Sequence, residues 1–177
     1  MKVEVRANEV VIDGYVNAVE RFSKPLRSPI GRFIEKISQG VFERALNKAD
    51  NVRVLLNHDY SRELASNKNG TAKLYEDNIG LRATVRISDE EVIQKAKEGK
   101  LKGWSFGFVP IEQDSVPTES GIFERTVRDL ELREVSIIDE RKTPAYVGTS
   151  IEMRGTEEVQ VEFRGLEFDE VEVLETK

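Results

Sequence analysis

Alternation of apolar and polar residues is the dominant pattern along most of this chain. Such alternation, enriched in Val and Ile, is typical of half-buried β-strands. Breaks are expected near Asn8, at Gly14 and at Asp77–Asn78, the last of which predicts a hairpin. The segments predicted as strands are residues 2–20, 52–56, 72–87, 103–112, 122–130 and 132–138.

Two segments have helical spacing instead. Apolar residues recur at near-helical intervals over residues 34–46, and Gly40 is expected to divide this segment into two short helices. The clearest helix is predicted over 89–98, where Ser88 and Glu91 fit a capping box. Because strands predominate, we predict an α+β fold built around a compact β-barrel or sandwich and flanked by a few helices.

The charge of the chain is concentrated near its end. The 177 residues include 33 acidic and 27 basic ones, a net charge of −6. Residues 151–177 hold nine acidic and three basic residues, which leaves 24 of each in residues 1–150. We therefore predict one folded body, 1–150, followed by an acidic tail, 151–177, that forms a strand or stays disordered until bound. An electrically balanced body gives no support to nucleic-acid binding.

Composition also excludes several chemistries. The chain has no Cys and one His, so disulfides, thiolate zinc sites and sites built from several histidines are excluded. The Walker A, GxGxxG and HExxH motifs are absent. We expect no cofactor and no metal. No apolar run approaches the roughly 20 residues of a membrane helix, and the first residues do not resemble a signal peptide, so we expect a soluble intracellular protein.

Two residues are candidates for catalysis by a base and a nucleophile. His58 lies in LLNHD, at the end of a predicted buried strand, where an imidazole can act as a general base near neutral pH. Ser105 lies in KGWSFGF, where Gly103 and Gly107 would let backbone N–H groups approach an oxyanion. The alternatives are a loop histidine and a serine on the polar face of an amphipathic strand. The opposite face of that strand would carry Trp104, Phe106 and Phe108.

A third candidate is the carboxylate of Glu134, in LELREVSIID. Strand alternation places it on one face with Leu132 and Ser136. Because both faces are largely apolar, the carboxylate needs a partner, either an Arg in an ion pair or a histidine that it orients. Ser136 is a rival nucleophile on the same face. A serine, a histidine and an acid are the parts of an acyl-transfer triad, although their order here is not that of the commonest protease folds.

The motifs GVFERAL, VRVLLNHDYSRELA, LYEDNIGL, GKLKGWSFGF, LELREVSIID and TPAY, in this order, resemble the caudovirus prohead serine protease family, distantly related to herpesvirus assemblin. The resemblance covers about residues 10–148 and implies a barrel flanked by helices. It implies that His58 is the base and Ser105 the nucleophile, with Glu134 third by chain order. If Glu134 does not have this role, the alternatives are Asp59, Asp129 and Asp139.

The resemblance extends to an oxyanion site. Relatives use an arginine pair after the third member, and Arg141–Lys142 stands at a similar place here. The resemblance therefore implies Arg141 as an oxyanion donor. The alternative is a solvated basic turn.

The same resemblance implies a biological role. The protein would be a serine endopeptidase of a tailed phage or prophage, acting inside the prohead in the host bacterial cytoplasm. Its substrates would be the scaffold protein or the scaffold-like part of the major capsid protein, and also itself, with the acidic tail as a segment removed by self-cleavage. The herpesvirus relatives need to dimerise for activity, so a homodimer is implied. The alternatives are an inactive capsid-assembly or scaffold protein that keeps the protease fold, and a non-viral binding domain.

Overall fold

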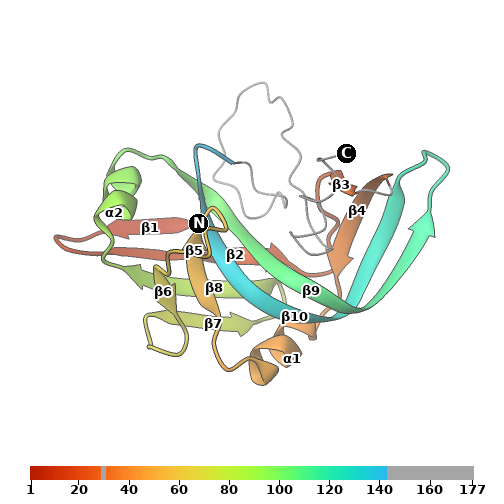
Figure 1. Cartoon of the computed structure of the whole chain (residues 1–177), viewed down its shortest axis with the longest axis horizontal. Coiled ribbons are helices and arrows are strands. Elements are labelled where there is room, and N and C mark those ends of the chain that lie inside the picture. Colours follow the sequence, from red (N-terminus) through yellow and green to blue (C-terminus); the bar gives the residue numbers. More distant parts are fainter. Residues whose placement is uncertain (29–30, 143–177) are drawn as a thin grey trace.

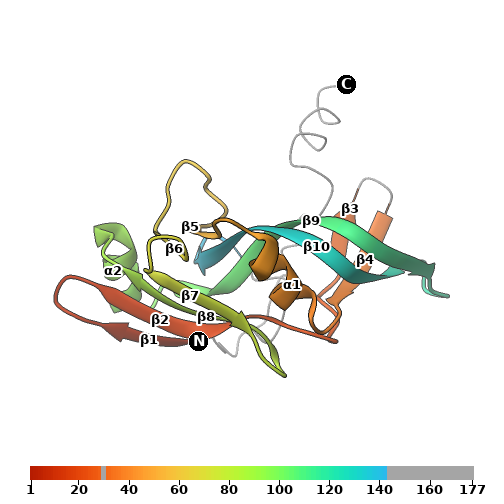
Figure 2. The same cartoon turned by 90° about the horizontal axis from the view of Figure 1, so that it is seen from below.

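The computed structural model describes residues 1–28 and 31–142 (Figure 1). The described strands form two sheets that lie one above the other (Figure 2), and two short helices pack against them. The predicted acidic tail, 151–177, lies outside the described residues.

The first sheet has four antiparallel strands in the order β1-β2-β8-β7. The predicted hairpin is confirmed, because the Asp77 carboxylate accepts hydrogen bonds from the backbone N–H groups of Ile79 and Gly80 between β7 and β8. The expected break at Gly14 is wrong, since β2 runs through it. The strands are β1 (Lys2–Val5), β2 (Val10–Ala18), β7 (Ala72–Glu76) and β8 (Gly80–Ile87).

The second sheet is organised around one long strand, β10. One edge of β10 pairs antiparallel with β9 along its length, and its other edge pairs parallel with β4 in its first half and with β5 in its second half. The short strands β3 and β6 complete the order β3-β4-β10-β5-β6. The strands are β3 (Leu26–Ser28), β4 (Gly31–Ile37), β5 (Arg53–Leu56), β6 (Ala65–Ser66), β9 (Leu101–Pro117) and β10 (Phe123–Asp139).

A single hydrophobic core fills the space between the sheets. The two sheets approach closely where β2 faces β9. A Cβ added at Gly14 would lie 2.9 Å from Nε1 of Trp104, which is almost fully buried. Trp104, Phe106 and Phe108 share one face of β9, as predicted, and all three belong to the core, which leaves the opposite face for Ser105 and Gly107.

Both helices are eight residues long and are held by carboxylates at their first turns. In α1 (Val41–Lys48), the Glu76 carboxylate accepts hydrogen bonds from the N–H groups of Gly40 and Glu43, at 2.6 and 2.8 Å. In α2 (Glu90–Lys97), the cap is the Asp89 side chain rather than the predicted Ser88. Neither helix has the length or apolar content to cross a membrane.

Two further predictions about the fold, the barrel and the helix beginning at residue 34, are wrong. A barrel closes only when the end strands of a sheet pair with each other. Among the described residues both sheets are open: the first ends at β1 and β7, and the second ends at β3 and β6, which have only three and two residues. The first half of the predicted 34–46 helix is strand β4, in which Phe33, Glu35 and Ile37 alternate inward. The helix begins only after Gly40, whose φ is 79°.

The predicted strand faces near Glu134 are wrong because β10 contains a β-bulge there. Leu132 pairs with Phe108 and Glu134 with Gly107, so Arg133 is an extra residue on β10. The extra residue reverses the alternation. Leu132 therefore lies on the core face, and Glu134 shares the other face with Ser136 but not with Leu132.

Candidate active site

His58 lies in a strained turn at the end of β5. The chain leaves Leu56 and places both Asn57 and His58 in the left-handed region, with φ of 53° and 64°. Non-glycine residues rarely adopt this conformation, which costs on the order of 1 kcal/mol each and is concentrated at functional sites. Two hydrogen bonds to β10 hold the turn: Asn57 N–H donates to the carbonyl of Ile137 at 2.9 Å, and His58 N–H donates to Oγ of Ser136 at 3.1 Å.

The His58 imidazole is paired with the Glu134 carboxylate. The distance from Nδ1 to Oε1 is 2.7 Å. The Glu134 side chain is fully buried and that of His58 is 11% exposed. An ionised carboxylate can only accept hydrogen bonds, so Nδ1 carries the proton in the neutral imidazole. Nε2 is then left as a hydrogen-bond acceptor and a potential base. Of the two partners predicted for Glu134, the histidine is the one observed.

Ser136 bonds to the same carboxylate. Its hydroxyl donates to Oε2 of Glu134 at 2.5 Å and accepts from His58 N–H. Both carboxylate oxygens of Glu134 are therefore used, one by the imidazole and one by the hydroxyl. The carboxylate is held in one orientation at the base of the site.

Ser105 lies on the same face of the β9–β10 ribbon. It pairs directly with Ser136 across the two strands. Directly opposite residues of an antiparallel pair have Cβ atoms about 4.5–5.5 Å apart, so the two hydroxyls are near neighbours. Like Glu134 and Ser136, Ser105 is fully buried. The fold thus brings together three predicted residues that are far apart in sequence.

Gly107 makes room for the carboxylate. A Cβ added there would lie 2.5 Å from Oε1 of Glu134 and 3.2 Å from the hydroxyl oxygen of Tyr60. The sequence suggested that this glycine would expose backbone N–H groups, but in the structure it lets Glu134 lie across β9. Sequence reasoning missed Tyr60, and its position two residues after His58 is the signal that could have found it. Burial and the nearby Glu134 charge raise the pKa of Tyr60.

The other carboxylates considered for the third role interact elsewhere. Each of them has a hydrogen-bonding partner other than His58. The Asp59 carboxylate accepts from Ser61 at 2.6 Å, that of Asp129 from Lys48 at 2.9 Å, and that of Asp139 from Arg141 at 2.7 Å.

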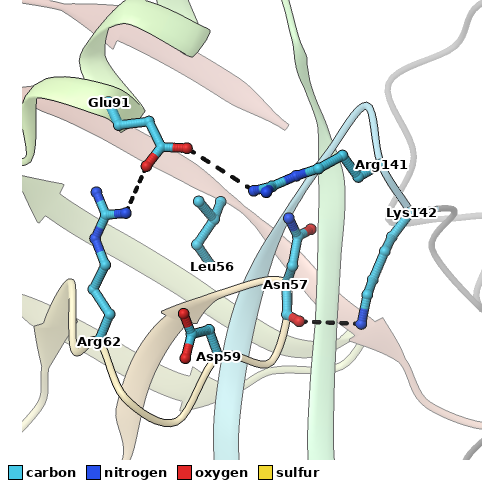
Figure 3. Close-up of a pocket in the computed structure, with 7 residues that line it drawn as sticks. All are labelled: Leu56, Asn57, Asp59, Arg62, Glu91, Arg141 and Lys142. Carbon is cyan, nitrogen blue, oxygen red and sulfur yellow. Dashed lines mark hydrogen bonds and ion pairs between the residues drawn. The ribbon is translucent and has the colours of Figure 1, made fainter.

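Arg141 and Lys142 line a cavity of about 260 Å³ beside the His58 turn (Figure 3). Its other lining residues are Leu56, Asn57, Asp59, Arg62 and Glu91. The Lys142 ammonium donates to the Asn57 carbonyl at 3.1 Å, and the Arg141 guanidinium binds both oxygens of Asp139. The role of Arg141 as an oxyanion donor stays a prediction.

The Asp139 carboxylate joins the His58 turn to α2. Burial alone would raise the pKa of Asp139, but hydrogen bonds from Arg141, Asn57 and Lys95 outweigh it and hold the pKa well below its ordinary value.

No group of three or more potential metal ligands is found in residues 1–28 and 31–142.

A buried imidazole–carboxylate pair with serine hydroxyls on the same face is the arrangement found in serine hydrolases. A comparison with family models agrees with this class. The model of the caudovirus prohead serine protease matches residues 1–162, so the chain belongs to this family. The membership confirms the predicted resemblance and indicates a serine protease of phage capsid maturation. A comparison with curated proteins found no match.

Proposed function

We propose that this protein is a serine endopeptidase that cleaves the scaffold protein, or the scaffold-like part of the major capsid protein, inside the prohead. The observation that carries the proposal is the 2.7 Å hydrogen bond between Nδ1 of His58 and the buried Glu134 carboxylate. This bond lies on the ribbon face that also holds Ser105. Family membership supports the reaction class, and the geometry supports the roles of the three residues.

The contacts of Ser136 count against it as the nucleophile. A serine hydroxyl has one proton, and Ser136 donates that proton to Oε2 of Glu134. Its oxygen also accepts from the backbone of His58. A proton held by an ionised carboxylate is not available to Nε2 of His58. These contacts count against Ser136, and the family resemblance implies that the attacking hydroxyl is that of Ser105, on the neighbouring strand.

The reaction is acyl transfer in two steps. Nε2 of His58 takes the proton of Ser105 as Oγ bonds to the scissile carbonyl carbon, and the resulting imidazolium donates that proton to the leaving amine as the C–N bond breaks. Water then attacks the acyl-enzyme with the same base, and the serine is regenerated. Glu134 holds the Nδ1–H tautomer and stabilises the imidazolium throughout. Backbone N–H groups near the strand ends, with Arg141, are proposed to stabilise the oxyanion.

One observation favours the alternative of an inactive capsid-assembly protein. Ser105 is fully buried in this structure, so a substrate reaches it only if the groups above it move. An assembly protein that retains the fold needs no such opening. Reaction of Ser105 with a small electrophile separates these two functions.

The test is covalent labelling by a serine-reactive organophosphonate, combined with co-expression with the neighbouring capsid protein. We expect an adduct on the tryptic peptide that contains Ser105, and a shortened capsid protein. Both should be lost in Ser105→Ala. Mass spectrometry of the wild type and of this variant also tests whether the acidic tail is removed by self-cleavage.

Three outcomes would contradict the proposal or part of it. An adduct on Ser136, with cleavage retained in Ser105→Ala, would move the nucleophile to β10. No adduct and intact capsid protein in the wild type would favour the assembly protein. An intact tail in both proteins under assembly conditions would remove self-cleavage. The homodimer stays a prediction, which sedimentation of the purified protein would test.

A further inference from the structure

Ser136 makes two buried hydrogen bonds that the acyl-transfer steps do not use. Its hydroxyl donates to Oε2 of Glu134 at 2.5 Å and accepts from His58 N–H at 3.1 Å. The residue is fully buried and lies two positions from Glu134, on the same face of β10. One hydroxyl thus contacts both the carboxylate and the backbone of the residue that the carboxylate orients.

We propose that Ser136 is a positioning residue that fixes the His58–Glu134 pair in its working geometry. This inference rests on the proposed function only in naming His58 as the base. Without the hydroxyl, Oε2 loses the hydrogen bond from Ser136, and the carboxylate loses one of the two hydrogen bonds that fix its orientation. His58 N–H loses its acceptor at the same time, in a turn whose two left-handed residues depend on contacts with β10.

The effect of Ser136 on catalysis is indirect. The hydroxyl reaches Oε2, whereas the imidazole is bound to Oε1. Its loss therefore changes how well Glu134 holds the Nδ1–H tautomer, and leaves the nucleophile in place. A buried hydrogen bond to a charged group is worth enough that we expect kcat to fall about 10- to 100-fold in Ser136→Ala. KM should change little, because Ser136 touches no substrate.

The single histidine of this chain makes the pair directly observable. In protein labelled with ¹⁵N-histidine, the two ring nitrogens report the fraction of each tautomer. We expect wild-type His58 to be protonated at Nδ1 in its neutral form, and Ser136→Ala to show a mixture of tautomers. Ser136→Thr, which retains the hydroxyl, should restore both the tautomer and kcat.

The matched control is Ser23→Ala. Ser23 is also buried, donates to the carbonyl of Lys24 and accepts from Glu35 N–H, but lies beside β4 rather than at the site. We expect this variant to keep the wild-type tautomer and kcat. If Ser136→Ala does not fold, Ser136→Cys, close to serine in size but a weak donor, takes its place in the same measurement.

A wild-type tautomer and an unchanged kcat in Ser136→Ala would overturn the positioning role. The tautomer is measured without substrate, so it tests this inference even if the protein cleaves nothing. Conversely, organophosphonate labelling of wild-type Ser105 tests the proposed function without involving Ser136. Failure of the positioning role of Ser136 is thus distinguishable from failure of the proposed protease function.

Discussion

Replacing Glu134 by Gln is the sharpest test of the site, because it removes a charge and one acceptor with almost no change in volume. The carboxylate accepts from Nδ1 of His58 at 2.7 Å and from Oγ of Ser136 at 2.5 Å. A glutamine offers one oxygen and one NH₂ group for these two positions. It therefore cannot accept both hydrogen bonds, whichever way the amide is turned.

Either orientation of the amide damages the base. If the NH₂ group faces His58, Nδ1 has to accept and the ring proton moves to Nε2, where it blocks proton transfer from Ser105. If the oxygen faces His58, the tautomer survives but the imidazolium loses its negative partner. The equivalent change in a serine-protease triad lowers kcat by about 10⁴-fold. We expect a loss of about 10³- to 10⁴-fold here, which corresponds to roughly 4–5.5 kcal/mol of transition-state stabilisation.

The assay is the rate at which a fluorescent organophosphonate inactivates the purified protein, measured beside the ¹⁵N spectrum of His58. Circular dichroism and the urea unfolding midpoint show whether the fold is intact. The matched control is Glu131→Gln on the same strand, since that side chain is 54% exposed and pairs with Arg133. The control should react at the wild-type rate.

Labelling of Glu134→Gln at the wild-type rate, with the tautomer unchanged, would refute the orienting role. The third role would then pass to Asp59, Asp129 or Asp139, despite their present partners. Slow labelling in the Glu131→Gln control would instead mean that the substitution disturbs β10 generally.

Two further predictions follow from the surroundings of the site. In Gly107→Ala the new Cβ would lie 2.5 Å from Oε1 of Glu134, so the carboxylate has to move away from His58. We expect cleavage to slow about 10²-fold. Cleavage at the wild-type rate would count against the contact between Gly107 and Glu134. Hydrogen bonds that outweigh burial hold the pKa of Asp139 below its ordinary value of 3.8. The carboxylate therefore contributes stability that is present above pH 3.8 and is lost as the pH falls below it. Urea unfolding of Asp139→Asn should therefore show a weaker dependence on pH than the wild type between about pH 4 and pH 2, and parallel curves would contradict the ion pairs.

Local patterns predicted most of the strands but not how the strands pair into two open sheets. The alternation over 72–87 and the turn at Asp77–Asn78 correspond directly to β7 and β8. Strand β4 was missed because Ile34 and Ile37 are three residues apart, a spacing that fits a helix, while the inward residues of the actual strand include Glu35. A buried carboxylate on the inward face masks the alternation in the sequence. Its partner, Arg125, comes from β10 and is invisible to any local pattern.

The sequence predicted the candidate site residues and offered a histidine as one of two partners for Glu134, but it did not predict the contacts of Ser136. Alternation identified Glu134 as a carboxylate in need of a partner, and family resemblance named His58 and Ser105. The role of Ser136 was not predictable, because it depends on the distance from its hydroxyl to Oε2. The bulge at Arg133 also could not be read from LELREV, since the extra residue is defined only by the pairing with β9.

The site depends on β10 having partners on both of its edges. Parallel pairing with β5 sets Ser136 opposite Leu55, which brings the His58 turn to the carboxylate, and antiparallel pairing with β9 sets Ser136 opposite Ser105. His58 and Glu134 are 76 residues apart, and neither pairing alone assembles the site. A partly folded or partly synthesised chain therefore has the histidine and the serine but no oriented base. For the proposed function, this geometry makes activity a property of the completed fold and not of any one segment.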